Sequence, residues 1–278
     1  MKLLSGLPST DVWRVLRAGE PFRGMEAFSD SFLATHRKHL KAYAQKWVAD
    51  PLHQWSRIWE YLFVLERLEA WRAEAVPGQV RILDAGSGIT FFPYYVAQRL
   101  GGCRLTCCDS DSGLSGIFHQ VNAAMPVPAE FCSADVQRLP FADASFDALY
   151  CVSVLEHMDR PDEVVDEFAR VLTPNGVLLV TFDISLDGKA DVPLAGAQRL
   201  RERLRRRFSG DAGETGDLAA MCRQSDVLTT AFVGNEEPDL LPWRSAKRSR
   251  IARWLRPNAP VRVPKLLTVF GESYRKAA

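Results

Sequence analysis

Residues 80–88 carry the sequence VRILDAGSG, in which an apolar run ends in a turn with two glycines. Glycine has no side chain, so the backbone N–H groups around Gly86 and Gly88 can approach a ligand closely. A turn of this kind serves NAD, FAD and S-adenosylmethionine alike. The third glycine of the dinucleotide fingerprint is absent, because Thr90 and Phe91 follow the turn. The stretch therefore predicts a nucleotide-binding α/β sheet and leaves the ligand open.

Downstream of this turn, short apolar runs alternate with helical patterns, which is typical of a parallel sheet with crossover helices. The runs are apolar almost throughout, as expected for strands that are covered on both faces. We expect a doubly wound, mostly parallel, seven-stranded sheet of the Rossmann-like class. The predicted strands are Val80–Ala85, Arg104–Asp109, Glu130–Ala134, Phe146–Val152, Val177–Asp183, Val227–Val233 and Lys265–Phe270. The predicted helices are Phe92–Leu100, Leu114–Ala124, Asp162–Leu172, Leu194–Phe208 and Asp217–Gln224.

Two amphipathic helical patterns precede the sheet. One spans residues 25–49 and ends before Pro51, and the other spans residues 53–73 with an aromatic stripe. We therefore expect an N-terminal helical cap over residues 1–78. The sheet domain follows over residues 79–278, with insertions at about 186–212 and 236–264.

The composition is that of an ordinary globular protein, with 47% hydrophobic and 25% charged residues in 278. No apolar run approaches the ~20 residues that span a bilayer. The apolar stretch in residues 1–7 is too short for a signal peptide, so a cytoplasmic location is expected. The six cysteines have no C-x-x-C spacing, which favours reduced core thiols over a metal site. The net charge of +1 indicates no class of partner.

Two acidic residues follow later strands at the edge where open α/β sheets bind ligands. Asp109 ends the second strand, where its carboxylate can accept hydrogen bonds from a ribose diol; capping of the loop is the alternative. Asp135 follows the third strand, where Asp135 and Val136 can contact an adenine. The sequence thus predicts a nucleoside site formed by successive strand ends.

These segments together resemble the class I S-adenosylmethionine-dependent methyltransferases, in particular the small-molecule, methyltransferase type 11-like family. The likeness covers about residues 80–183. It rests on ILDAGSG at 82–88, Asp109, AD at 134–135, LPF at 139–141, SFDALYCVSVLEHM at 145–158 and RVLTPNGVLLV at 170–180. The pattern departs from many relatives at Ile89 and Thr90, where a further glycine is common.

The resemblance implies S-adenosyl-L-methionine as the cofactor and assigns a part of it to each motif. The turn of Gly86, Ser87 and Gly88 would hold the methionine end, with Asp84 ordering the turn from beneath. The remaining implied contacts are Asp109 and Ser110 at the ribose, Asp135 and Val136 at the adenine, and the Cys151 carbonyl at the methionine ammonium.

The segment SRIWEY at residues 56–61 is similar to a stretch in methyltransferases from surface-polysaccharide gene clusters. This similarity predicts that Arg57 and Tyr61 contact the methionine carboxylate or close the site. Packing of an aromatic helix on the sheet explains the same residues equally well.

A catalytic base is expected only for some acceptors, because an alcohol must lose its proton whereas a neutral amine need not. His157 follows the fourth strand and titrates in the useful range, and Asp183 ends the neighbouring strand, where it could orient the imidazole. In some natural-product sugar O-methyltransferases of the family that the chain resembles, a His and an Asp at these two positions take these parts, and the resemblance implies the same here. Capping of a turn is the alternative for His157. The other four histidines, His36, His39, His53 and His119, are expected to be structural.

We therefore expect O-methylation of a small-molecule hydroxyl, on a saccharide or a natural product. N-methylation, an oxidoreductase and a non-catalytic cofactor-binding protein are the alternatives. The arginines between Arg199 and Arg207 form either a solvated surface or a site for a phosphorylated or acidic acceptor. Nucleic acid is not expected as a partner, and the oligomeric state stays open.

Overall fold

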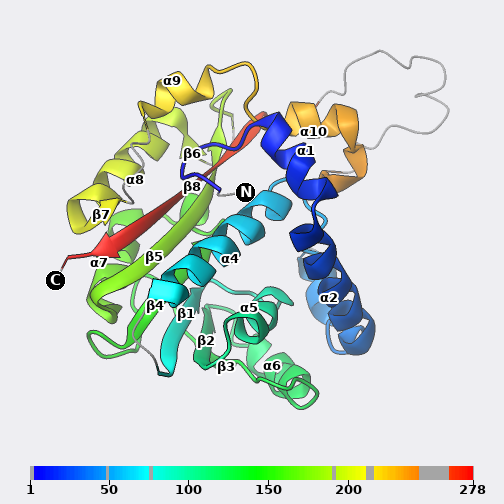
Figure 1. Ribbon diagram of the computed structural model, residues 1–278, viewed down its shortest axis with the longest axis vertical. Coiled ribbons are helices and arrows are strands. Elements are labelled where there is room, and N and C mark those ends of the chain that lie inside the picture. The colour runs from blue at the N-terminus through cyan, green and yellow to red at the C-terminus, as the bar shows by residue number, and fades with distance from the viewer. Residues whose placement is uncertain are drawn as a thin grey trace.

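The computed structural model describes residues 3–47, 50–74, 78–189, 192–210, 216–243 and 263–277. In this part of the chain an eight-stranded sheet lies between two layers of helices (Figure 1). Its strands are β1 (Val80–Ala85), β2 (Cys103–Asp109), β3 (Glu130–Ser133), β4 (Phe146–Val152), β5 (Leu172–Ser185), β6 (Val192–Pro193), β7 (Phe208–Gly210) and β8 (Leu267–Lys276).

The strand order is β3-β2-β1-β4-β5-β8-β7, with the short β6 paired to β5. Strands β1 to β6 pair in parallel, while β8 runs antiparallel to both β5 and β7. This confirms the predicted doubly wound, mostly parallel sheet. The order reverses between β1 and β4, and ligands of open α/β sheets bind at the carboxyl ends beside such a switch point.

The helices divide between the two faces of the sheet. Those before the sheet are α1 (Thr10–Ala18), α2 (Glu20–His36), α3 (Lys41–Lys46) and α4 (Arg57–Glu74). Those within it are α5 (Phe92–Leu100), α6 (Leu114–Asn122), the 3-10 turn η1 (Leu155–His157), α7 (Pro161–Val171), α8 (Leu194–Arg207), α9 (Leu218–Cys222), α10 (Thr230–Glu236) and the 3-10 turn η2 (Pro238–Leu240). One apolar core lies under α4, α5 and α6, and a second lies under α7 and α8.

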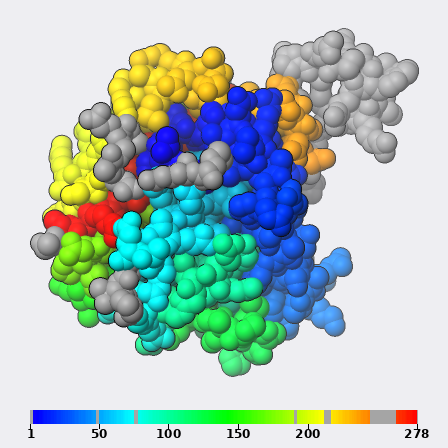
Figure 2. Space-filling model, viewed as in Figure 1, coloured from blue at the N-terminus to red at the C-terminus, as the bar shows by residue number. Residues whose placement is uncertain are grey.

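Helix α4 packs directly on the middle of the sheet. A side chain at Gly271 in β8 would come within 2.7 Å of the Trp59 ring and 3.1 Å of the Phe63 ring, so only glycine allows this approach. Seen from the same side, α4 and the N-terminal residues cover the central strands (Figure 2). The segment predicted as a cap thus supplies one of the helices that cover the sheet. The boundary at residue 78 stays a prediction.

Some predictions about single elements are wrong. Residues 227–233 were expected to form a strand, but only Val227 makes a β-bridge, to Ser9, and helix α10 starts at Thr230. The Thr229 side chain accepts the Phe232 N–H and caps that helix, so a β-branched run hides a helix start. The pattern over residues 25–49 is two helices, α2 and α3, which a turn after His36 separates.

Three further findings concern the described residues alone. No helix among them is long and apolar enough to cross a membrane. All six cysteines lie in this part of the chain and are free thiols. Among the same residues, no group of three or more His, Cys, Asp or Glu side chains could hold a metal ion.

Candidate functional site

A cavity of about 390 Å³ opens at the carboxyl ends of β1, β2 and β4, beside the switch point of the sheet. Its volume lies in the range of small-molecule sites in proteins. The sequence-predicted residues that line it are Arg57, Tyr61, Asp84, Gly86, Ser87, Gly88, Asp109, Ser110, Asp135, Val136 and His157. The strand ends that the sequence singled out therefore meet at one cavity.

Two predicted residues do not line the cavity. Cys151 is fully buried in the core, while its neighbours Val152 and Ser153 do line the cavity. Asp183, two residues before the end of β5, is half-buried and also lies outside the lining.

The glycine turn is fixed by the strand beside it. Gly86 and Gly88 have φ angles of 74° and 53°, a region that favours glycine. The N–H groups of Gly86 and Ser87 both donate to the Cys108 carbonyl at 2.9 Å. The Gly88 N–H donates to Asp109 Oδ2 at 2.9 Å. Hydrogen bonds thus join the glycine turn to the Asp109 carboxylate at the end of β2.

Asp109 keeps the capacity to bind a ligand although its side chain is anchored. Its Oδ1 accepts the Asp111 N–H at 2.9 Å, and its Oδ2 accepts the Gly88 N–H. A carboxylate has about four acceptor positions, so each oxygen can accept one more hydrogen bond. The arrangement presents two adjacent acceptors to the cavity, which matches a vicinal diol.

Asp84 is an acid held away from water beneath the turn. Its residue is 5% exposed, and burial raises its pKa to about 8. The Tyr150 hydroxyl lowers that pKa, and the charge of Asp109 raises it. Asp84 is therefore mostly protonated at neutral pH in the unliganded protein, and a cation placed beside it would favour its ionised form.

Helix α3 covers the cavity above the turn. The Tyr43 hydroxyl lies where a side chain at Gly88 would be. Burial raises the pKa of Tyr43 to about 12, so the hydroxyl is neutral. Lys46 on the same helix pairs with Asp111, beyond the end of β2, at 2.7 Å. The sequence reasoning missed these contacts, because nothing local in residues 41–46 points to the turn.

A buried polar network, which we call the Glu60 network, joins α4 to the ends of β4 and β5. Glu60 is fully buried and accepts hydrogen bonds from Ser153 Oγ at 2.8 Å and Thr181 Oγ1 at 2.5 Å. Arg57 pairs with the same carboxylate and donates to Ser153 Oγ at 2.6 Å. Burial alone would lower the pKa of Arg57, but the charges of Glu60 and Asp183 raise it overall. An acid inside the apolar stripe of residues 58–63 is the signal that could have found Glu60.

Glu156 connects the two predicted catalytic residues. It precedes His157 in η1, and its Oε1 accepts the Asp183 N–H at 3.1 Å. Burial raises the pKa of Glu156 to about 8, and the charge of Glu60 raises it as well. His157 is an exposed residue of the cavity lining, and its backbone N–H donates to the Val154 carbonyl at 2.9 Å. The turn that carries His157 is thus joined to strand β5 by a hydrogen bond.

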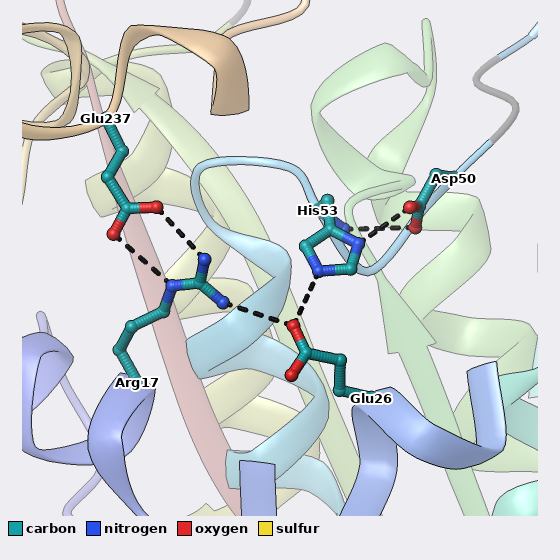
Figure 3. A network of polar contacts seen from close by, with 5 residues as sticks. All are labelled: Arg17, Glu26, Asp50, His53 and Glu237. Carbon is teal, nitrogen blue, oxygen red and sulfur yellow. Dashed lines mark hydrogen bonds and ion pairs between the residues drawn. The ribbon is translucent and has the colours of Figure 1, made fainter. Parts of the chain in front are cut away.

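A second polar network outside the cavity holds the segment that contributes Pro51 and Gln54 to the lining. His53 contacts Asp50 through Nδ1 at 2.6 Å and Glu26 through Nε2 at 2.9 Å. Hydrogen bonds to these carboxylates raise the pKa of His53 to about 9, so it is protonated and donates to both. The network consists of Arg17, Glu26, Asp50, His53 and Glu237 (Figure 3).

The arginines of α8 mostly bind acids of the chain itself. Arg201 and Arg205 contact Glu272 at 3.1 and 2.7 Å. Arg203 and Arg207 contact Asp166 at 2.6 and 2.8 Å. None of the residues of α8 lines the cavity. Arginines are also frequent in residues 244–262, which lie outside the described residues.

The chain is similar in sequence to known methyltransferases. Residues 83–180 match a family described as "Methyltransferase domain". The chain is 31% identical over 144 residues to "Methyltransferase GfsG" of Streptomyces halstedii, covering 51% of this chain and 49% of that protein. It is 30% identical over 224 residues to "24-methylenesterol C-methyltransferase 2" of Oryza sativa subsp. japonica, covering 70% and 54%.

The chain covers about half of the length of these relatives or less. Among solved structures, the fold is similar to the "MccD protein" with a TM-score of 0.50 and 13% identity, covering 77% of this chain and 96% of that one. That likeness concerns the fold alone.

Proposed function

We propose that this chain, whose residues 83–180 match a methyltransferase domain, is a class I S-adenosylmethionine-dependent methyltransferase that transfers a methyl group to a hydroxyl oxygen of a small molecule. The acceptor we propose is a saccharide or a natural product. The observation that carries the proposal is the meeting of the glycine turn, Asp109, Asp135 and His157 at one cavity.

The residues present fit S-adenosylmethionine. Side chains at Gly86 or Gly88 would collide with Val154 or Tyr43, so both positions require glycine, and both glycines line the cavity. Asp109 offers paired acceptors for the ribose, with Ser110 beside it. At the third strand, the Gln137 N–H fixes Asp135 at 2.8 Å, and Asp135 with Val136 would hold the adenine.

At the methionine end we assign the carboxylate to Arg57 and Tyr61. The contact expected from the Cys151 carbonyl stays a prediction, because Cys151 is buried behind Val152 and Ser153. When bound, the cofactor supplies a sulfonium methyl group that a nucleophile can displace directly. The chain contributes alignment of the two reactants and exclusion of water.

His157 is the base in this proposal, and Asp183 orients it. The imidazole would take the hydroxyl proton as the oxygen attacks. Glu156 supports both, since it holds the Asp183 backbone next to the turn that carries His157. We also propose that the protein acts in the cytoplasm.

The test is His157→Ala, with S-adenosylhomocysteine binding and methyl transfer measured side by side. We expect turnover to fall by roughly two to four orders of magnitude while S-adenosylhomocysteine affinity is unchanged. His119→Ala is the matched control, because His119 lies on α6 and not in the cavity lining. Unchanged turnover would remove His157 from the mechanism.

Carbon methylation is a second candidate, because the rice relative is named a C-methyltransferase. An alkene acceptor is neutral and has no hydroxyl proton for His157 to remove before attack. Assays with hydroxylated and alkene-bearing acceptors of similar size would separate the two reactions.

A further inference from the structure

Glu60 is the most deeply buried charged group near the cavity. Its side chain has no exposed surface, and three donors converge on its carboxylate: Arg57, Ser153 Oγ and Thr181 Oγ1. Both hydroxyls donate to it, which is the pattern of an ionised carboxylate, since that group only accepts. A buried charge is tolerated only when it is paired and hydrogen-bonded, so Glu60 and Arg57 stabilise one another.

Arg57 uses only one of its nitrogens in this network. Among the described residues, every hydrogen bond of its guanidinium leaves from Nη1, to Glu60, to Ser153 Oγ at 2.6 Å and to Ser56 Oγ at 3.4 Å. The side chain is 18% exposed and lines the cavity. The Nε and Nη2 edge thus remains available for a planar anion, which guanidinium binds through two parallel hydrogen bonds.

The network also fixes the loop that forms the adjoining wall. Ser153 has a φ of 50°, an uncommon conformation for a residue with a side chain. Its N–H donates to the Thr181 carbonyl at 2.9 Å, and its Oγ lies between Arg57 and Glu60. The guanidinium and the strained turn are therefore held by the same carboxylate.

Arg57 lies at the glycine-turn end of the cavity. Arg57, Tyr61 and Asp84 line the same cavity as the glycine turn. Val154, which follows Ser153, lies 2.5 Å from where a side chain at Gly86 would begin. This is the end to which the proposed function assigns the methionine part of the cofactor.

We propose that Glu60 is a positioning residue, which holds Arg57 at the cavity wall so that its free edge receives the methionine carboxylate of the cofactor. The inference rests on the proposed function and adds a residue that does not touch the ligand. The negative charge of Glu60 reduces the pull of Arg57 on an anion. Without it, however, the guanidinium would not keep one buried orientation.

The test compares two nucleosides that differ in the amino-acid part. S-adenosylhomocysteine carries the carboxylate, whereas 5′-methylthioadenosine lacks the whole amino-acid group. We expect Arg57→Gln and Glu60→Gln each to weaken S-adenosylhomocysteine binding by about 10- to 100-fold, the range of a hydrogen bond to a charged group. Binding of 5′-methylthioadenosine should stay within about twofold, since it makes no such bond. Isothermal titration calorimetry measures both.

Glu69→Gln is the matched control, because Glu69 is also on α4 but pairs with Arg99 away from the cavity. It should change neither affinity. Thr181→Val provides a second variant that keeps Glu60 and removes one of its donors, and it carries the test if Glu60→Gln does not fold. We expect Thr181→Val to weaken the binding of S-adenosylhomocysteine but not that of 5′-methylthioadenosine, and by less than Glu60→Gln does.

If Glu60→Gln weakened the binding of both nucleosides equally, the role of Glu60 would be structural only, and the inference would be overturned. Unchanged S-adenosylhomocysteine affinity in that variant would overturn it too. If the wild-type chain bound neither nucleoside, the proposed function itself would fail, and this inference with it.

Discussion

Raising the pH from 6 to 8 should strengthen S-adenosylmethionine binding, because one carboxyl group of the cavity ionises over this range. Burial raises the pKa of Asp84 to about 8, and Asp84 lines the cavity beneath the glycine turn. The cationic end of the ligand favours the ionised carboxylate over the neutral acid. Binding should therefore release a proton below pH 8.

The size of the effect follows from the titration of this group. With a pKa of about 8, the ionised fraction of Asp84 rises from about 1% at pH 6 to about half at pH 8. If only the ionised form binds, the affinity rises by about 50-fold, which corresponds to about 2 kcal/mol. The Tyr150 hydroxyl lowers the pKa of Asp84. Tyr150→Phe removes this hydroxyl, so the rise in affinity should occur at higher pH.

Calorimetry at pH 6, 7 and 8 on the wild type and Asp84→Asn tests the reasoning. The amino group of the ligand also titrates, but it does so equally in both proteins, so the ratio of their affinities isolates Asp84. Glu156→Gln is the control, because the pKa of Glu156 is also about 8 although its side chain does not line the cavity. A ratio that stays constant across this pH range would refute the assignment.

Three further predictions concern stability, each measured by urea unfolding. His53 has a folded pKa of about 9, so its ion pairs stabilise the protein fully below pH 6.5, and this is lost as the pH rises through 9. His53→Gln should cost about 1–2 kcal/mol at pH 6.5, after allowance for solvent screening, and nothing at pH 10. Glu272→Gln should cost about 3–5 kcal/mol, because it leaves the buried Arg201 without its carboxylate. Gly271→Ala should cost about 1–3 kcal/mol, since the added methyl meets the Trp59 ring at 2.7 Å.

Each of these has a clear contrary outcome. A cost for His53→Gln that persists at pH 10 would show that packing and not charge is lost. Arg206→Ala, on the exposed face of α8, should change the free energy of unfolding by less than about 0.5 kcal/mol, against which Glu272→Gln is judged. Wild-type stability of Gly271→Ala would show that α4 can move away from β8.

The parallel strands and the glycine turn could be predicted because their signals are local. An apolar run bounded by a turn identifies a buried strand, and the carboxyl ends of parallel strands share one edge of the sheet. Asp109 and Asp135 therefore could be placed at the cavity from their positions in the chain alone. The strand expected at residues 227–233 failed for a local reason as well, since the Thr229 cap outweighs the β-branched run.

Contacts between distant segments could not be predicted in the same way. Tyr43 covers a glycine 45 positions further along the chain, and no pattern in α3 reveals its partner. Glu60 meets Ser153 and Thr181 across separations of 93 and 121 residues. Such pairs depend on how α4 crosses the sheet, which the periodicity of a helix leaves undetermined.

The position of α4 bears on the function of the N-terminal segment. It buries 11 of its 18 residues, including the charged Glu60 and Arg67, and its Trp59 lies against the backbone of β8. A helix that only capped the site could move away without exposing the sheet. Withdrawal of α4 would instead expose an apolar core and leave Glu60 without Ser153 and Thr181, at a cost of several kcal/mol for an unpaired buried charge. Helix α3, by contrast, has no buried residue and contacts the glycine turn through Tyr43, so it can move without exposing this core.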